Sequence, residues 1–168
     1  NDRNPIMSID TNIVGTANIA KICHELNIKL IYISTDYVYN NSIKREINEK
    51  DSLKPINNYG WSKLGGECAV HMISNYLILR CSLCDIPFRH EVAFDNIYRT
   101  PITHKDAAKL ILKVKDEIGV INIGGPTKTV YDFVKEYQDI TPITYKGDNP
   151  QIASIKLDTT KLKKIINE

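Results

Sequence analysis

Apolar residues recur at helical spacing near the start of the chain and then give way to a short, largely apolar run. Ile9, Ile13 and Ala17 repeat every four residues. Such positions share one face of a helix, which predicts a helix over about residues 8–26. The run at residues 28–33 is bounded by turn-forming positions, which is typical of a parallel strand buried on both faces.

The alternation of helical and strand patterns continues to the end of the chain. Further helices are expected at about residues 59–74, 103–117 and 129–138 and from 158 onward, and further strands at 76–80, 120–123 and 143–145. Residues 40–58 predict a polar loop, and residues 85–99 predict an irregular segment. Thr103, Thr129 and Asp158 are suited to cap the helices that follow them. Crossovers of this length imply a right-handed parallel sheet, so the predicted class is α/β.

One group of polar side chains suggests chemistry at the end of the first strand. Thr35 closes that strand, and Tyr59 and Lys63 follow one helical turn apart. Residues at i and i+4 share a helix face, so the Lys63 ammonium can lie beside the Tyr59 phenol. A free tyrosine titrates near pH ~10, and a nearby cation is expected to lower that pKa and make Tyr59 an acid or base near neutrality. The set can protonate a carbonyl oxygen during hydride transfer, with Thr35 bonded to the same oxygen.

The same spacing occurs a second time without this context. Tyr131 and Lys135 also stand four residues apart, but no strand ending in Thr precedes them at a suitable distance. We therefore interpret the second pair as part of an ordinary amphipathic helix.

Several motifs resemble, in order, one known family. They are I-S-T-D-Y-V-Y at residues 33–39, P-I-N-N-Y-G-W-S-K-L-G-G-E at 55–67, R-C-S-L at 80–83, the stretch 92–108 and L-D-T-T-K-L at 157–162. This series resembles the extended short-chain dehydrogenase/reductases that act on nucleotide sugars, and among them the dTDP-4-dehydrorhamnose reductases. The resemblance implies a partial Rossmann-like, doubly wound parallel sheet. Residues 1–82 would be the C-terminal part of an NAD(P)-binding domain, and residues 83–168 a substrate-binding lobe.

The resemblance also implies an activity and a role for each site residue. The activity is reduction of a keto sugar nucleotide by NADPH or NADH, in deoxysugar biosynthesis. The implied roles are catalytic for Thr35, Tyr59 and Lys63, cofactor-binding for Tyr59 and Lys63, and substrate-binding for Thr35, Asp36, Tyr37 and Arg99. For Arg99, contact with the substrate diphosphate and an ordinary surface position remain open alternatives.

Three departures from the family pattern keep other functions open. The sequence has no glycine-rich strand–turn–helix for the cofactor pyrophosphate. Leu83 stands where the rhamnose reductases carry a Trp, and the segment between residues 80 and 95 is short. The alternatives are a non-catalytic regulatory or binding protein on the same fold, and a nucleotide-sugar epimerase or dehydratase. A homo-oligomer, or a partner chain that supplies the glycine-rich half, is a further expectation.

Composition excludes some classes of function. The chain has 168 residues with 42% hydrophobic content, 25% charged content and a net charge of +2, which is ordinary for a globular domain and makes no case for nucleic acid. No stretch approaches the ~20 apolar residues of a membrane span, and we expect a cytoplasmic protein.

The four cysteines predict free thiols in a reducing compartment. Cys81 and Cys84 form a C-x-x-C pattern, which in other contexts is redox-active or half of a zinc site. No second such pair exists, and the four histidines show no ligand spacing, so no metal is expected. Gly124 and Gly125 follow a predicted strand, where a strand-ending turn is an alternative to a phosphate contact.

Overall fold

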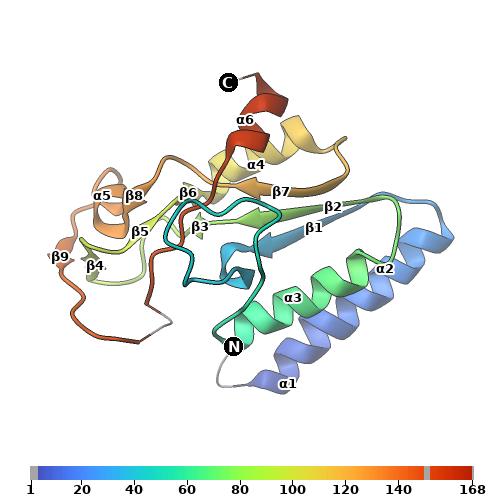
Figure 1. The fold of residues 1–168 in the computed structure, drawn as a ribbon, viewed down its shortest axis with the longest axis horizontal. Coiled ribbons are helices and arrows are strands. Elements are labelled where there is room, and N and C mark those ends of the chain that lie inside the picture. Colours follow the sequence, from blue (N-terminus) through green and yellow to red (C-terminus); the bar gives the residue numbers. More distant parts are fainter. Residues whose placement is uncertain (1–3, 150–151, 168) are drawn as a thin grey trace.

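A three-stranded parallel sheet forms the centre of the fold, in the order β1–β2–β7 (Figure 1). The structure is a computed structural model that describes residues 4–149 and 152–167. The strands are β1 (Leu30–Thr35), β2 (Tyr76–Cys81) and β7 (Gly119–Ile123). All pairings are parallel, so the predicted α/β class is confirmed, although β1 begins and ends two residues later than expected.

A helical run and one further helix cover the lower face of the sheet in Figure 1. Their bounds are α1 (Pro5–Ser8), a π-helical segment η1 (Ile9–Val14), α2 (Gly15–Glu25) and α3 (Asn58–Val70). The helix expected over residues 8–26 is thus confirmed and begins earlier. Val70 of α3 packs with Tyr32 of β1 and Ile78 of β2 in a buried apolar cluster.

Two glycines let α3 approach its neighbours closely. A Cβ on Gly66 would collide with the Tyr32 hydroxyl of β1. A Cβ on Gly65 would stand 2.8 Å from the Ile13 side chain of η1. Both contacts would be closer than real Cβ atoms come to other atoms. Glycine is therefore required at both positions, where α3 meets β1 and η1.

The opposite face of the sheet is covered by α4 (His104–Val114) and α6 (Thr160–Ile166) (Figure 1). Here the main core gathers alternate residues of the sheet with apolar residues of both helices, including Leu77, Leu79, Ile121, Ile123, Val114 and Leu162. Because successive residues of a strand point to opposite faces, β2 contributes to the clusters on both sides of the sheet.

Short strand pairs build the lobe on the left of Figure 1. They are β3 (Leu83–Cys84) with β6 (Ile102–Thr103), β4 (Val92–Phe94) with β9 (Thr141–Ile143), and β5 (Tyr98–Arg99) with β8 (Lys128–Thr129). The expectation that residues 85–99 are irregular is therefore wrong for β4 and β5. The expected strand at residues 143–145 lies instead at Thr141–Ile143.

Helix caps agree with the sequence in two of three places. Thr103 and Thr129 accept backbone N–H groups at the starts of α4 and α5 (Val130–Val134), as expected. α5 ends before the expected residue 138. The N-cap position of the last helix is Thr159, not Asp158, and the Thr159 side chain makes no capping hydrogen bond. The Asp158 carboxylate instead accepts the N–H of Thr160 at 2.8 Å.

The C-terminal half of the chain contributes to the central sheet as well as to the small lobe. β7 pairs with β2, and α4 and α6 pack on the same sheet although all three follow residue 83. The division into residues 1–82 and 83–168 remains an interpretation of the sequence.

A buried ion pair joins α3 to β2. Arg80 donates to the Glu67 carboxylate through Nη2 at 2.7 Å and through Nε at 3.1 Å, and the two side chains are 3% and 1% exposed. Arg80 Nη1 also donates to the Tyr39 hydroxyl at 3.0 Å, which donates to Asn122 Oδ1 at 2.7 Å. The network therefore ties together α3, β2, β7 and the segment that follows β1.

Removing one charge of the buried pair should destabilise the fold strongly. Glu67→Gln should lower the free energy of unfolding by ~3–5 kcal/mol, because Arg80 is then buried without its counter-charge. The double change Glu67→Leu with Arg80→Met, which removes both charges, should cost less. Urea unfolding measures the free energy of unfolding of each variant.

The control for this prediction is an exposed ion pair. Lys109 and Asp106 pair on α4 with side chains 63% and 48% exposed, so Lys109→Gln should change the free energy of unfolding by only ~0–1 kcal/mol. Equal losses of unfolding free energy in Glu67→Gln and Lys109→Gln would show that the buried pair stabilises the fold no more than an exposed one.

Candidate active site

A pocket of about 310 Å³ opens at the carboxyl end of β1. Its lining consists of Ile33, Ser34, Thr35, Asp36, Tyr37, Tyr59, Lys63, Cys81 and Leu83. Ligand sites of open α/β sheets form at this edge. The pocket brings together Thr35, Tyr59 and Lys63, as the sequence predicts.

Thr35 stands where β1 turns into a short 3₁₀ helix, η2 (Asp36–Val38). Its side chain is 5% exposed. The Thr35 hydroxyl accepts the backbone N–H of Tyr37 at 3.3 Å and donates to Asp36 Oδ1 at 3.3 Å. The turn therefore fixes the hydroxyl at the pocket wall.

Tyr59 lies in the first turn of α3, close to η2. Asn57 caps the helix by accepting the N–H of Gly60 at 2.7 Å. A Cβ on Gly60 would stand 2.5 Å from the Tyr37 carbonyl oxygen, so this glycine allows the helix start to contact η2 directly. The rings of Tyr37 and Tyr59 meet edge to face with centroids 6.3 Å apart.

The pKa of the Tyr59 phenol is raised above its ordinary value, opposite to the expectation from sequence. Burial is the main cause, and the negative charge of Asp36 acts in the same direction. A side-chain hydrogen bond with Thr35 partly offsets both effects. The phenol is consequently protonated at neutral pH, which suits a proton donor rather than a base.

Lys63 lines the pocket, but its ammonium contacts a different aromatic ring. Nζ lies 4.2 Å from the ring centroid of Tyr32, in a cation–π contact. Burial lowers the pKa of Lys63, while the charge of Glu67 raises it. The expectation that Lys63 lowers the pKa of Tyr59 is wrong in this arrangement, because the Tyr59 side chain turns toward Thr35 and the Lys63 side chain toward Tyr32.

Arg99 is a partly buried ion-pair partner, not an exposed surface residue. Its Nη2 donates to Asp36 Oδ2 at 2.6 Å, and the two side chains are 14% and 2% exposed. The guanidinium also lies over the Tyr37 ring, 4.6 Å from its centroid. The surface alternative is therefore wrong. Arg99 Nε is buried and has no hydrogen-bond partner among the described residues.

Four pocket residues, Ile33, Ser34, Cys81 and Leu83, were not identified from sequence as site residues. Ser34 has a buried Oγ with no hydrogen-bond partner in the described part of the chain, and Cys81 lies beside Thr35 in the strand register. Leu83 is 40% exposed at the pocket. The parallel register of β1 and β2 places Cys81 beside Thr35. This register can be used only once the strand order is known.

The second Tyr–Lys pair is separate from the pocket. Tyr131 lies on α5, and the Lys135 ammonium sits 4.9 Å from its ring centroid. Neither residue lines the pocket.

The glycine pair after β7 is a packing turn. A Cβ on Gly124 would stand 2.7 Å from the Thr100 carbonyl oxygen, and one on Gly125 would stand 2.6 Å from that of Pro101. Gly125 N–H donates to the Thr100 carbonyl at 3.0 Å. This contact accounts for both glycines without a phosphate.

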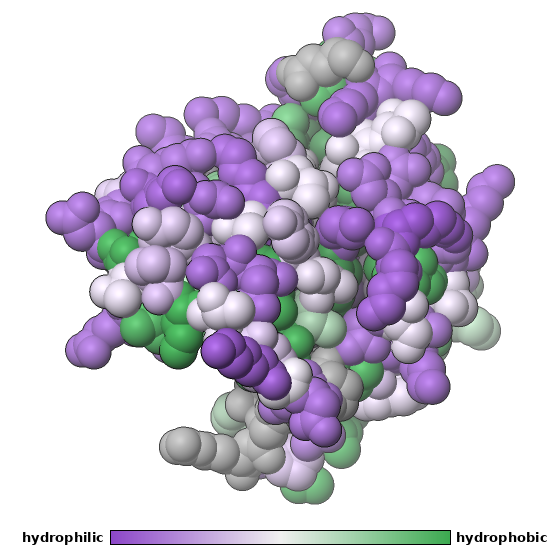
Figure 2. Space-filling view, turned by 60° about the vertical axis from the view of Figure 1, so that its left-hand side comes forward, coloured by the Kyte–Doolittle hydropathy of each residue, from purple (hydrophilic) through white to green (hydrophobic). Residues whose placement is uncertain are grey.

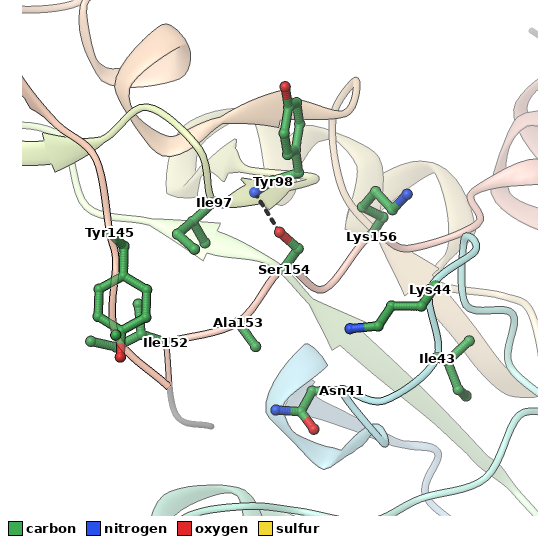
Figure 3. Close-up of a pocket in the computed structure, with 11 residues that line it drawn as sticks. Asn41, Ile43, Lys44, Ile97, Tyr98, Tyr145, Ile152, Ala153, Ser154 and Lys156 are labelled. Carbon is green, nitrogen blue, oxygen red and sulfur yellow. Dashed lines mark hydrogen bonds between the residues drawn. The ribbon is translucent and has the colours of Figure 1, made fainter. Parts of the chain in front are cut away.

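A second cavity, of about 350 Å³, lies between the small lobe and the loop that follows η2 (Figure 3). Lys44, Lys156 and Tyr98 are among its lining residues, and Ser154 Oγ accepts the backbone N–H of Tyr98 at 2.9 Å. It shares no lining residue with the Thr35 pocket. The face shown in Figure 2 is largely hydrophilic with small apolar patches.

Comparison with known proteins shows a likeness to dTDP-4-dehydrorhamnose reductases in the first half of the chain. Residues 3–84 match the RmlD substrate binding domain. The chain is similar over 61 residues, at 44% identity, to the dTDP-4-dehydrorhamnose reductase of Mycolicibacterium smegmatis, which covers 35% of this chain and 18% of that protein. Over these residues the chain is similar to dTDP-4-dehydrorhamnose reductases. This result confirms the resemblance to extended short-chain dehydrogenase/reductases seen in the motifs.

Solved reductase structures extend the likeness to most of the fold. The dTDP-4-dehydrorhamnose reductase of Clostridium acetobutylicum superposes with a TM-score of 0.76 at 25% identity, covering 93% of this chain and 65% of that one. The Bacillus anthracis reductase, in complex with NADP, gives a TM-score of 0.75 at 23% identity and covers 90% and 63%. The chain thus spans just under two thirds of these two solved structures, and the match spans less than a fifth of the curated relative.

Neither a metal site nor a membrane span is found in the described residues. Among residues 4–149 and 152–167, no three His, Cys, Asp or Glu side chains are grouped to hold a metal ion. Within the same ranges, every helix is too short or too polar to cross a bilayer.

The C-x-x-C cysteines are free thiols with raised pKa values. Burial raises the pKa of Cys81 to about 12. Burial and the charge of Asp85 raise that of Cys84 to about 11. Both are therefore neutral and weakly nucleophilic near pH ~8, below these raised pKa values.

Thiol labelling should separate these cysteines from Cys68. Cys68 is exposed, so Ellman's reagent should modify it first, and Cys68→Ser should remove the fast phase. Cys81 and Cys84 should react mainly after unfolding. Rapid loss of both thiols in the folded protein under mild oxidation would instead favour a redox role for the C-x-x-C pattern.

Proposed function

We propose that this chain carries the proton-donor site and substrate lobe of an NAD(P)H-dependent reductase of keto sugar nucleotides, in deoxysugar biosynthesis. The observation that supports it most is the convergence of Thr35, Tyr59 and Lys63 in one pocket at the carboxyl edge of a parallel sheet. The likeness to dTDP-4-dehydrorhamnose reductases gives the substrate class.

In this proposal Tyr59 protonates the carbonyl oxygen of the sugar. Its raised pKa keeps the proton on the phenol until negative charge develops on the substrate oxygen. The Thr35 hydroxyl then donates to the same oxygen and stabilises that charge. Asp36 and Tyr37 contact the sugar, and the unpartnered Nε of Arg99 is a donor available to the diphosphate after a small movement.

The nicotinamide end of the cofactor would contact this pocket. NADPH or NADH supplies the hydride when bound. Lys63 would hold the nicotinamide ribose, because its side chain lines the pocket and carries three N–H donors. The buried, unpartnered Ser34 hydroxyl would give a second polar contact.

The open edge of β1 supports the proposed partner for this site. Among the described residues, β1 pairs only with β2 and so has one free edge. Ile33 on this strand is 38% exposed. We propose that a further parallel strand, from a segment or partner chain with a glycine-rich turn, pairs here and holds the cofactor pyrophosphate. A homo-oligomer remains a prediction for analytical ultracentrifugation.

The 168-residue chain by itself should bind nicotinamide dinucleotides weakly. Backbone amides at a helix N-terminus after a glycine-rich turn normally hold the pyrophosphate, and this sequence contains no such motif. Isothermal calorimetry with NADPH and NADH tests this expectation. Affinity tighter than ~1 µM, about −8.2 kcal/mol, would contradict it.

Tyr59→Phe should lower turnover by ~10²-fold or more, the usual contribution of a general acid. The substitution keeps the ring and its contact with Tyr37 but removes the proton. Lys63→Ala should reduce both turnover and cofactor affinity. The assay follows nicotinamide oxidation with a 4-keto-6-deoxy sugar nucleotide, in a form of the protein that binds the cofactor.

Tyr131→Phe is the matched control and should leave turnover unchanged. Equal activity of the Tyr59 and Tyr131 variants would refute the mechanism. Interconversion of sugar nucleotides without net nicotinamide oxidation would instead favour the epimerase or dehydratase alternative. A folded protein that binds a protein partner and shows no turnover would favour the regulatory alternative.

A further inference from the structure

Arg99 connects to the candidate acid through two intervening side chains. Its Nη2 donates to Asp36 Oδ2 at 2.6 Å, and the other carboxylate oxygen, Oδ1, accepts the Thr35 hydroxyl at 3.3 Å. Thr35 and Tyr59 line the same pocket, and the side-chain interaction with Thr35 lowers the pKa of Tyr59. The four residues therefore form one chain of contacts from the small lobe to the end of β1 and the start of α3.

The position of Arg99 in this chain is fixed by its surroundings. The residue lies on β5, opposite Lys128 of β8, and makes a backbone bridge to Ile155. Its guanidinium packs over the Tyr37 ring at 4.6 Å. A planar cation held on two sides presents Nη2 to Asp36 in a defined direction.

The Thr35 hydroxyl connects the Asp36–Arg99 ion pair to the pocket that contains Tyr59. A hydroxyl has one hydrogen to donate. Thr35 has two acceptors for it, the Asp36 carboxylate and the oxygen of Tyr59. A carboxylate without a counter-ion attracts that hydrogen strongly, whereas one paired with a guanidinium attracts it less. The charge on Arg99 therefore influences which acceptor Thr35 serves.

We propose that Arg99 is a positioning residue that, by pairing with Asp36, weakens the hold of the Asp36 carboxylate on the Thr35 hydroxyl, so that this hydroxyl can turn to Tyr59 and the substrate oxygen. The proposal rests on the proposed role of Tyr59 as proton donor. It assigns Arg99 an effect on the acid that is exerted before any substrate diphosphate arrives.

The direction of the expected effect follows from the groups around Tyr59. Burial and then Asp36 raise its pKa, the Thr35 hydrogen bond lowers it, and Cys81 and Tyr37 add smaller increases. Lys63 lines the same pocket. Without Arg99, the charge of Asp36 is not offset and Thr35 turns toward the carboxylate. Both changes should raise the pKa of Tyr59 further.

The test measures ionisation of position 59 without any ligand. 3-Fluorotyrosine, placed only at position 59, gives a single ¹⁹F NMR signal whose shift reports its ionisation. Arg99→Gln should move this titration to higher pH. Asp36→Asn should move it to lower pH, because the nearby negative charge is removed. Arg99→Lys, which keeps the charge, should stay closer to the native chain than Arg99→Gln.

Two controls keep the result interpretable. Lys128→Gln removes a cation from the strand opposite Arg99, where Lys128 pairs with Glu136, and should leave the titration unchanged. If Arg99→Gln does not fold, the double change Asp36→Asn with Arg99→Gln restores a neutral pair and should titrate below the native chain. An unmoved titration in folded Arg99→Gln, or a double variant that titrates at or above the native chain, would overturn the proposal.

This measurement is independent of the proposed reductase activity. If no sugar nucleotide is reduced but the titration moves as expected, the link from Arg99 to Tyr59 stands and the proposed function fails. If reduction is observed and the titration does not move in folded Arg99→Gln, the link fails and the proposed function stands. A role of Arg99 limited to the diphosphate predicts an unchanged titration, since no diphosphate is present.

Discussion

The buried pair of Glu67 and Arg80 is the constraint on which the site geometry depends. A carboxylate without solvent contact must be paired, so α3 can pack on β2 only where Glu67 meets the guanidinium. The same helix carries Tyr59 two turns earlier and Lys63 one turn earlier. Tyr39 and Asn122 extend the network to the loop after η2 and to β7. The pocket is therefore positioned by a polar network in the core as well as by apolar packing.

The sequence predicts the central part of this architecture because its signals are local and periodic. Helical spacing identifies α2 and α3, the capping threonines identify the starts of α4 and α5, and the strand-end rule brings Thr35 to the same edge as Tyr59. The short strands of the small lobe were missed, because a two-residue strand has no periodicity to detect. β5 and β8 form through their pairing with each other, and they are separated by many residues.

The sequence predicts which residues line the site better than it predicts their pKa values. Spacing alone places Lys63 near Tyr59, but the rotamers that direct one side chain to Tyr32 and the other to Thr35 depend on tertiary packing. Likewise, Arg99 follows Asp36 by 63 residues in the chain, and no local pattern relates them. Burial and the nearby charge of Asp36 determine the sign of the Tyr59 pKa shift, and both arise only when α3 packs beside the end of β1.

The contact at Gly60 bears on how much the site must rearrange when it works. The first turn of α3 meets the Tyr37 carbonyl with no side chain between them, so the turn that holds Thr35 and the helix that holds Tyr59 form one rigid corner. Two hydrogen-bond donors mounted on such a corner keep their separation while charge shifts on a ligand. Little reorganisation energy is then needed, which is the condition under which fixed dipoles stabilise a transition state most effectively.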